Sequence, residues 1–249
     1  MPSVSMSGIA PAPGAPGPLA EQVLPSPDVF ERLERLAPDL DRGVLALAVE
    51  ARSCAVRHGE VDDDARLAVI DYSKPSTQPR LWVFDVAADQ LLFHEYVAHG
   101  QGSGENIATR FSNRDGSHET SLGLYRTAET YMGGNGYSMR MDGLDAGFND
   151  HARARAIVMH GADYVDPVQA SARGRLGRSF GCPAVRREIA KVVIDSLKQR
   201  QLLFAFGNDA AWLRNGQSFA CDGRSAQQIL AAGRGMRAGG TPAGSLGAS

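Results

Sequence analysis

Short apolar segments separated by polar or glycine-containing turns dominate the chain between Leu67 and Phe206. Segments of this length and spacing are typical of strands rather than of core helices. Because no helix regularly follows each strand, the pattern predicts a mainly β, α+β fold with an antiparallel core rather than a doubly wound parallel sheet. The predicted strands are 67–72, 81–86, 91–97, 122–127, 137–141, 154–159 and 202–206.

Helical patterns flank this region. Ser26 as N-cap, with proline after it, predicts a short helix to about Leu36. A second helix is predicted to open at Pro38-Asp39 and to run from about Leu40 to Arg57, where apolar residues recur at helical spacing. Two later helices are predicted at 188–200 and between Cys221 and Leu230.

These elements predict one main domain with additions at both ends. Residues 1–25 are rich in proline, glycine and alanine, which is typical of a disordered linker. We expect an N-terminal helical pair at 26–60, the main domain at 61–222, and a short helix with a flexible, glycine-rich tail at 223–249.

Composition excludes several classes of protein. The formal net charge of the 249 residues is −2, so the sequence lacks the excess of basic residues that would indicate a nucleic-acid partner. No apolar run approaches the ~20 residues that a transmembrane helix needs. Three cysteines without a Cys-x-x-Cys pair predict neither a disulfide scaffold nor a zinc site.

Two stretches, around Cys182 and around His160, contain residues that could act as a nucleophile and its base. A cysteine attacks as thiolate, and an imidazole within reach can take its proton. Cys182 follows Gly181, whose small size would let a substrate carbonyl approach and leave backbone N–H groups free for an oxyanion. His160 closes an apolar segment that is predicted to be a buried strand, which is a rigid position for a base.

Together these stretches resemble the L,D-transpeptidase catalytic domain family, in particular its murein L,D-transpeptidase subgroup. That family carries His-Gly on one strand and Ser-x-Gly-Cys shortly after it, here His160-Gly161 and Ser179-Phe180-Gly181-Cys182. The resemblance extends from about Leu67 to Phe206. It includes Ile70-Asp71-Tyr72-Ser73-Lys74-Pro75, Ala98-His99-Gly100, Ser117-His118-Glu119-Thr120-Ser121-Leu122-Gly123 and Gly147-Phe148-Asn149-Asp150.

The resemblance implies an antiparallel β-sandwich with short helices, and a role for each motif residue. Cys182 would be the nucleophile, His160 the base, and the carbonyl of Gly161 would orient the imidazole. Ser179, Phe180 and Gly181 would flank the nucleophile, with the Gly181 and Cys182 N–H groups as oxyanion donors. The family calls for no metal and no organic cofactor.

Four further residues are candidates for the substrate cleft. Tyr164 either adds a hydroxyl to the site or packs in the core. His118 either lines the groove or is solvated, and His99 is a weaker candidate for the same role. Arg178 belongs to a basic cluster that by default is a solvated face, but a guanidinium there would suit the carboxylates of an acidic stem peptide.

The commoner family pattern differs from this sequence at two positions. Phe180 stands where a histidine is usual and Ala184 where an arginine is usual, although the Phe-Gly-Cys-Pro form is typical of the murein subgroup. The acyl acceptor therefore remains open. An amine would make the protein a transpeptidase and water an L,D-carboxypeptidase or another murein peptide hydrolase, and a catalytically silent wall-binding module is a further alternative.

The resemblance also predicts a location and partners. We expect a protein of the periplasm or extracellular envelope that acts on peptidoglycan stem peptides, although residues 1–20 lack the charged start and apolar run of a signal peptide. In such a compartment Cys54 and Cys221 could pair, but two free thiols, with Cys54 buried in its helix, are the default expectation.

Overall fold

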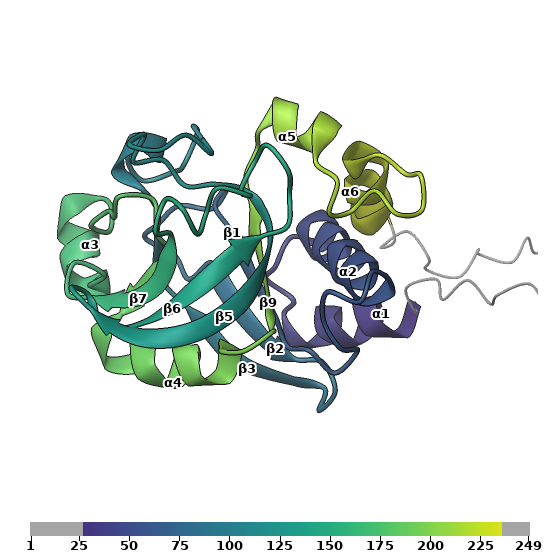
Figure 1. Ribbon diagram of the computed structural model, residues 1–249, viewed down its shortest axis with the longest axis horizontal. Coiled ribbons are helices and arrows are strands. Elements are labelled where there is room, and N and C mark those ends of the chain that lie inside the picture. Colours follow the sequence, from purple (N-terminus) through teal and green to yellow (C-terminus); the bar gives the residue numbers. More distant parts are fainter. Residues whose placement is uncertain (1–26, 236–249) are drawn as a thin grey trace, which may run out of the picture.

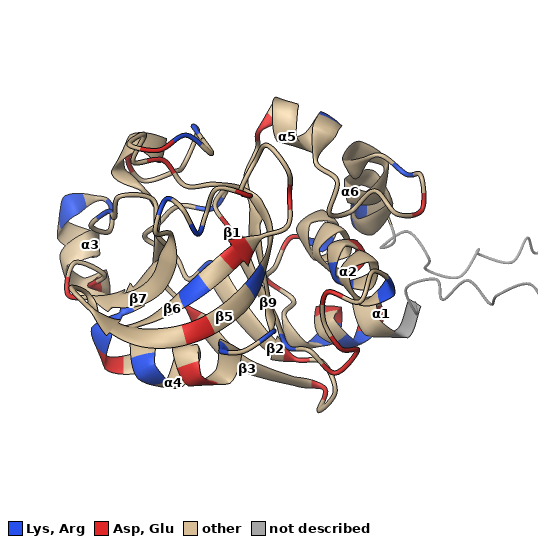
Figure 2. Ribbon diagram, viewed as in Figure 1, with Lys and Arg blue, Asp and Glu red and all other residues tan. Residues whose placement is uncertain are grey.

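The computed structural model describes residues 27–235 (Figure 1). The predicted linker at 1–25, the Ser26 cap and the tail beyond residue 235 lie outside the described residues. Within residues 27–235 no helix is both long and apolar enough to cross a bilayer. Acidic and basic residues are mixed over the face shown in Figure 2, with no large area of one sign.

One nine-stranded sheet organises residues 27–235, in the order β3-β2-β1-β9-β5-β6-β7-β8-β4. The pairs β1–β9 and β7–β8 are parallel, and the other six pairs are antiparallel. The strands are β1 (Leu67–Asp71), β2 (Leu81–Asp85), β3 (Gln90–Glu95), β4 (Val97–Ala98), β5 (Gly123–Gly133), β6 (Gly136–Gly143), β7 (Val158–Ala162), β8 (Ala184–Arg186) and β9 (Leu202–Phe206).

The sheet curves until it is nearly closed. Figure 1 shows β5, β6 and β7 crossing the front of the molecule while β2 and β3 run behind. Apolar side chains from both halves, among them Met139 of β6 and Val69 of β1, belong to one buried cluster. The prediction of a mainly antiparallel, sheet-dominated fold with short helices is therefore confirmed.

Helices pack against the inner strands β1 and β9 and against the part of the sheet formed by β6, β7 and β8. The helices are α1 (Pro27–Leu36), α2 (Arg42–Arg57), α3 (Pro167–Arg173), α4 (Arg187–Leu197), α5 (Ala210–Asn215) and α6 (Ala226–Gly235), with a 3₁₀ turn, η1, at Gln101–Ser103. Helix α2 begins later than predicted, because the Val44 N–H donates to the side chain of Asp41, which is the N-cap. Apolar residues of α1 and α2 belong to the same cluster as the sheet, so the helical pair shares the main core.

The sequence misplaced one strand and missed several short elements, among them η1 and the separate strand β4. The strand predicted at 154–159 begins only at Val158, because the chain turns just before it and Ala156 has a φ of 54°. Helices α3 and α5 and the three-residue strand β8 were not predicted. Strand β8 is stabilised by its pairing with β7 and β4 rather than by a local pattern.

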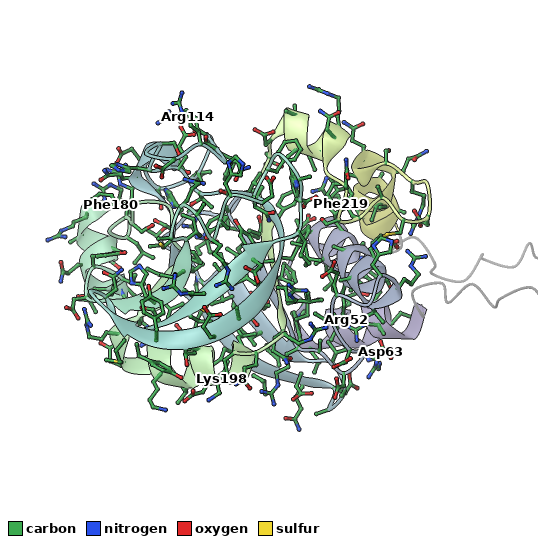
Figure 3. The ribbon with its side chains drawn as sticks, viewed as in Figure 1. Arg52, Asp63, Arg114, Phe180, Lys198 and Phe219 are labelled. Atoms are coloured by element: carbon green, nitrogen blue, oxygen red, sulfur yellow. A yellow bond between two sulfur atoms is a disulfide. The ribbon has the colours of Figure 1, made fainter. Side chains whose placement is uncertain are left out.

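The segment after β9 is fixed to the main domain by three features. Trp212 of α5 is fully buried and packs against Phe204, Phe206 and Phe219, of which Phe219 is labelled in Figure 3. The buried carboxylate of Asp145 accepts hydrogen bonds from the backbone N–H groups of Gln217 (2.8 Å) and Ser218 (2.9 Å) and from the Ser218 hydroxyl (2.7 Å).

The third feature is a disulfide between Cys54 of α2 and Cys221, whose Cα atoms are 5.7 Å apart. The default expectation of two free thiols is therefore wrong. The two cysteines are 167 residues apart in sequence, and their meeting depends on the packing of the C-terminal segment against α2. Sequence spacing carries no information about that packing.

Candidate active site

Strand β7 brings the His160 and Cys182 segments together. The His160 N–H lies 3.4 Å from the carbonyl oxygen of Pro183, and His160 is in register with Ala184 of β8. The Cys182 Sγ atom lies 3.4 Å from the backbone N of Val158, which donates to it. Because alternate residues of a strand point to one face, Val158 and His160 share a face of β7, and the sulfur lies against that stretch of the strand.

The His160 ring is fixed by its neighbour. Its Nδ1 atom is 3.1 Å from the carbonyl oxygen of Gly161. A carbonyl only accepts, so Nδ1 carries the proton and Nε2 is left as the acceptor. The imidazole is almost fully buried, with 3% of its surface exposed. Burial, together with the positive charge of Arg187, lowers the pKa of His160, so the ring is neutral at neutral pH.

Gly161 has a packing role besides that carbonyl. A Cβ atom at Gly161 would lie 2.7 Å from the Cβ atom of Ala190 and 3.2 Å from the Cα atom of Arg187. Helix α4 therefore packs directly against β7 at this residue. A larger side chain would push the helix away from the strand that carries His160.

Cys182 is the free thiol of the described chain and is half-buried. Burial raises the pKa of the thiol, and the hydrogen bond from Val158 together with the charge of Arg155 acts in the opposite direction. The resting site therefore holds a neutral thiol and a neutral imidazole rather than a preformed ion pair. A neutral imidazole beside a neutral thiol is the protonation state that general-base catalysis would require.

The turn before Cys182 is stabilised by the Ser179 hydroxyl. This hydroxyl donates to the carbonyl oxygen of Cys182 (2.6 Å) and accepts from the N–H of Gly181 (3.1 Å). The Gly181 N–H is therefore engaged within the turn. Within residues 27–235 no acceptor bonds the Cys182 N–H, which leaves that group for an oxyanion.

Gly181 is required at its position for two reasons. Its φ is +121°, which side chains rarely adopt. A Cβ atom would also lie 2.9 Å from the carbonyl oxygen of Glu119 and 3.0 Å from Cδ1 of Ile157. The turn thus packs tightly between the 117–120 segment and the start of β7.

Tyr164 lies beside both reactive groups. Its ring meets that of His160 edge-on, with the centroids 6.5 Å apart. Burial and the proximity of Cys182 raise the pKa of the Tyr164 phenol, so the hydroxyl stays protonated. Its backbone carbonyl accepts from Gly177, which ties it to the segment that leads into the nucleophile turn.

Phe180 and His118 form an aromatic pair at the surface near Cys182. Their rings stack with centroids 4.4 Å apart, and Phe180 is 68% exposed (labelled in Figure 3). The Nδ1 atom of His118 lies 3.1 Å from Nε2 of Gln101. His118 therefore contacts both Phe180 and Gln101 beside the turn that carries Cys182.

Arg178 and His99 are occupied by the protein itself. The guanidinium of Arg178 donates to the carbonyl of Gly104 and to Glu105, each at 2.8 Å. His99 is completely buried and does not line the cleft. Its Nδ1 atom accepts from Arg80 at 2.7 Å, and burial with the charge of Arg80 lowers its pKa to about 4.

One residue near the site was not singled out in the sequence. Arg155 precedes β7, and its guanidinium reaches Ser112, Ser117, Glu119 and Ser121. In the sequence it is one of two alternating arginines, and nothing local distinguishes it from Arg153. Arg153 instead pairs with Glu129 and Asp142 at the surface.

A model of the L,D-transpeptidase catalytic domain matches residues 36–206, and the chain therefore belongs to the L,D-transpeptidase catalytic domain family. This is a family of cell-wall enzymes that act on peptidoglycan. The match begins inside the N-terminal helical pair and ends with β9. No curated protein matches the chain.

Solved structures of L,D-transpeptidases are also similar to the chain. One from Mycobacterium smegmatis has 12% identity over 57% of this chain and 59% of that chain, with a TM-score of 0.35. One from Stackebrandtia nassauensis has 12% identity over 73% and 77%, with a TM-score of 0.36. L,D-transpeptidase 1 of Mycobacterium tuberculosis has 12% identity over 58% and 63%, with a TM-score of 0.33. The chain thus spans 59% of the M. smegmatis protein.

Proposed function

We propose that the protein is a cysteine acyltransferase that acts on peptidoglycan stem peptides by L,D-transpeptidation. The observation that carries the proposal is the contact of the Cys182 segment with β7, where Gly161 holds Nδ1 of His160 and leaves Nε2 as the proton acceptor. Membership of the L,D-transpeptidase family supports the substrate class.

In the first step the Cys182 sulfur attacks the carbonyl carbon between an L-centre and the terminal D-residue of a donor stem. His160 Nε2 takes the thiol proton and delivers it to the leaving amine as the C–N bond breaks. The Cys182 N–H stabilises the tetrahedral oxyanion, at roughly 3 kcal/mol for a donor of this kind. Ser179 and Gly181 hold the turn in the conformation that frees this N–H.

In the second step an amine from another stem, or from an envelope protein, attacks the thioester and loses its proton to His160. The sulfur leaves and recovers that proton. In this proposal Tyr164 would offer its hydroxyl to the reacting carbonyl or to the incoming amine, and its edge-on contact with His160 supports that role. The two steps transfer only protons and an acyl group, so they require neither a metal nor an organic cofactor.

The proposed location is the periplasm or extracellular envelope. The Cys54–Cys221 disulfide supports it, because disulfides persist in oxidising compartments and are rare in the cytosol. The family's action on the cell wall supports the same location.

Intact-protein mass spectrometry tests the proposal. After incubation with a tetrapeptide muropeptide, the expected result is an adduct of the donor tripeptide unit on Cys182. Product analysis then separates the acceptors: a cross-linked dimer identifies a transpeptidase, and a free tripeptide product identifies an L,D-carboxypeptidase. If no adduct forms and Cys182 resists a carbapenem, the chain is a wall-binding module instead.

A further inference from the structure

Arg155 binds one segment of the chain at four points. Its Nη1 atom donates to the carbonyl of Ser112 (2.7 Å) and to the Ser121 hydroxyl (2.5 Å). Its Nη2 atom donates to the Ser117 hydroxyl (3.1 Å) and to the carbonyl of Glu119 (2.9 Å). One guanidinium therefore fixes both ends and the middle of residues 112–121, and a planar fork of donors suits this task.

That segment forms a wall beside the nucleophile turn. The Glu119 carbonyl oxygen would lie 2.9 Å from a Cβ atom at Gly181, and Thr120 donates to the Gly181 carbonyl at 3.4 Å. His118, between them, stacks on Phe180. Any shift of residues 117–120 therefore moves Gly181 or the aromatic pair at the entrance.

Arg155 also brings charge close to the sulfur. Its Nη2 atom would lie 3.6 Å from a Cβ atom at Gly181, and the side chain is half-buried. Within residues 27–235 no carboxylate forms an ion pair with it, although Asp115 and Glu119 are close enough to act on its charge. The guanidinium thus brings a positive charge close to the turn that carries Cys182.

The other groups near the thiol are neutral at rest. His160 is a neutral imidazole on β7. Tyr72 is buried and Tyr164 is half-buried, and burial raises the pKa of both phenols. Both tyrosines lie close enough to Cys182 to respond to its charge, as does Arg155. Arg155 is therefore the cation among the groups that face the sulfur, and it favours the thiolate.

We propose that Arg155 is a positioning residue that holds the 112–121 segment against the nucleophile turn and supplies the positive charge that favours a developing thiolate on Cys182. The expected effect on acylation rests on the proposed function, because the 112–121 segment lies beside the same site. The inference concerns two properties, the four-point contact and the charge, which substitutions can separate.

Three variants separate them. Arg155→Lys keeps the charge but loses the planar fork. Arg155→Gln loses the charge and keeps a donor that reaches part of the segment. Arg153→Gln is the matched control, because Arg153 lies two residues away and is exposed, with its bonds directed to Glu129 and Asp142.

The first readout is the rate of Cys182 alkylation by iodoacetamide as a function of pH, corrected for the folded fraction. Arg155→Gln is expected to shift the profile to higher pH, because the thiolate loses its cation. Arg155→Lys and Arg153→Gln are expected to keep the profile of the unmodified protein. Equal profiles for Arg155→Gln and Arg153→Gln overturn the role of the charge.

The second readout is the rate of donor acylation against muropeptide concentration. Both Arg155 variants are expected to raise the half-saturating concentration about tenfold, the effect of losing one charged hydrogen bond, while Arg153→Gln leaves it unchanged. An unchanged value in Arg155→Lys overturns the wall assignment. If the unmodified protein forms no acyl adduct while the alkylation shift is observed, the proposed function fails and the charge assignment holds.

Discussion

The two sides of the molecule are stabilised in opposite ways. At the C-terminal side a disulfide links Cys54 to Cys221, and the buried carboxylate of Asp145 is satisfied by several donors. At the side of Cys182 and His160 hydrogen bonds hold the surrounding backbone, while within residues 27–235 neither Nε2 of His160 nor the Cys182 N–H has a hydrogen-bond partner. The comparison indicates that hydrogen bonds fix the backbone around Cys182 and His160, whereas Nε2 of His160 and the Cys182 N–H themselves are left without such links.

The largest expected effect is that of Cys182→Ala. The variant is expected to form no acyl-enzyme, because the nucleophile is absent, while its thermal unfolding stays close to that of the unmodified protein. Mass spectrometry with a muropeptide or a carbapenem measures the first property and calorimetry the second. If Cys182→Ala still forms an adduct on another residue, Cys182 is not the nucleophile.

His160→Ala is expected to slow acylation at neutral pH by about 10²-fold, because the thiol loses its base. In the unmodified protein the pKa of His160 is lowered, so acylation is expected to fall only below pH 6.5, where the ring begins to take a proton. In the variant the reaction depends on free thiolate, whose pKa is raised above 9.0, so its profile moves to high pH.

Stopped-flow acylation across pH measures both profiles, and His151→Ala, at an exposed histidine, is the control. The same profile in His160→Ala and in the unmodified protein would show that another group takes the proton.

Removal of the disulfide addresses the other side of the comparison. Cys54→Ser with Cys221→Ser is expected to lower the free energy of unfolding by about 2–4 kcal/mol, because the unfolded chain gains freedom. Acylation below the unfolding temperature is expected to change little. Urea denaturation with and without reductant measures the loss. If the reductant lowers the stability of the double variant as well, the loss does not come from the disulfide.

A smaller effect is expected from His99. The pKa of His99 in the folded protein is about 4, below the ordinary 6.5. Between these two pH values the unfolded chain binds a proton at His99 and the folded protein does not. The stability from this residue is complete above pH 6.5 and is lost as the pH falls toward 4, with a loss of about 2 kcal/mol by pH 5. Melting temperatures measured between pH 7 and pH 4.5 should fall less steeply in His99→Gln, and equal slopes would contradict the assignment.

The sequence predicted what depends on local pattern. Strands such as 202–206 and the apolar stripe of α2 follow from periodicity. Two motifs that carry their own chemistry led to the hypothesis that Cys182 and His160 react together. It did not predict the pairing of Cys54 with Cys221, the strand β8, or the contacts of Arg155. Each of these depends on residues that are distant in the chain, and the local sequence around them is ordinary.

The region shared with the family ends at residue 206, but the folding unit does not. A chain cut after β9 would leave Phe204 and Phe206 without the indole that covers them, and would leave a carboxylate at Asp145 facing an apolar interior with most of its donors gone. Residues 207–235 therefore cover buried groups of the main domain, and any shortened version for crystallography or assay should retain them through α6.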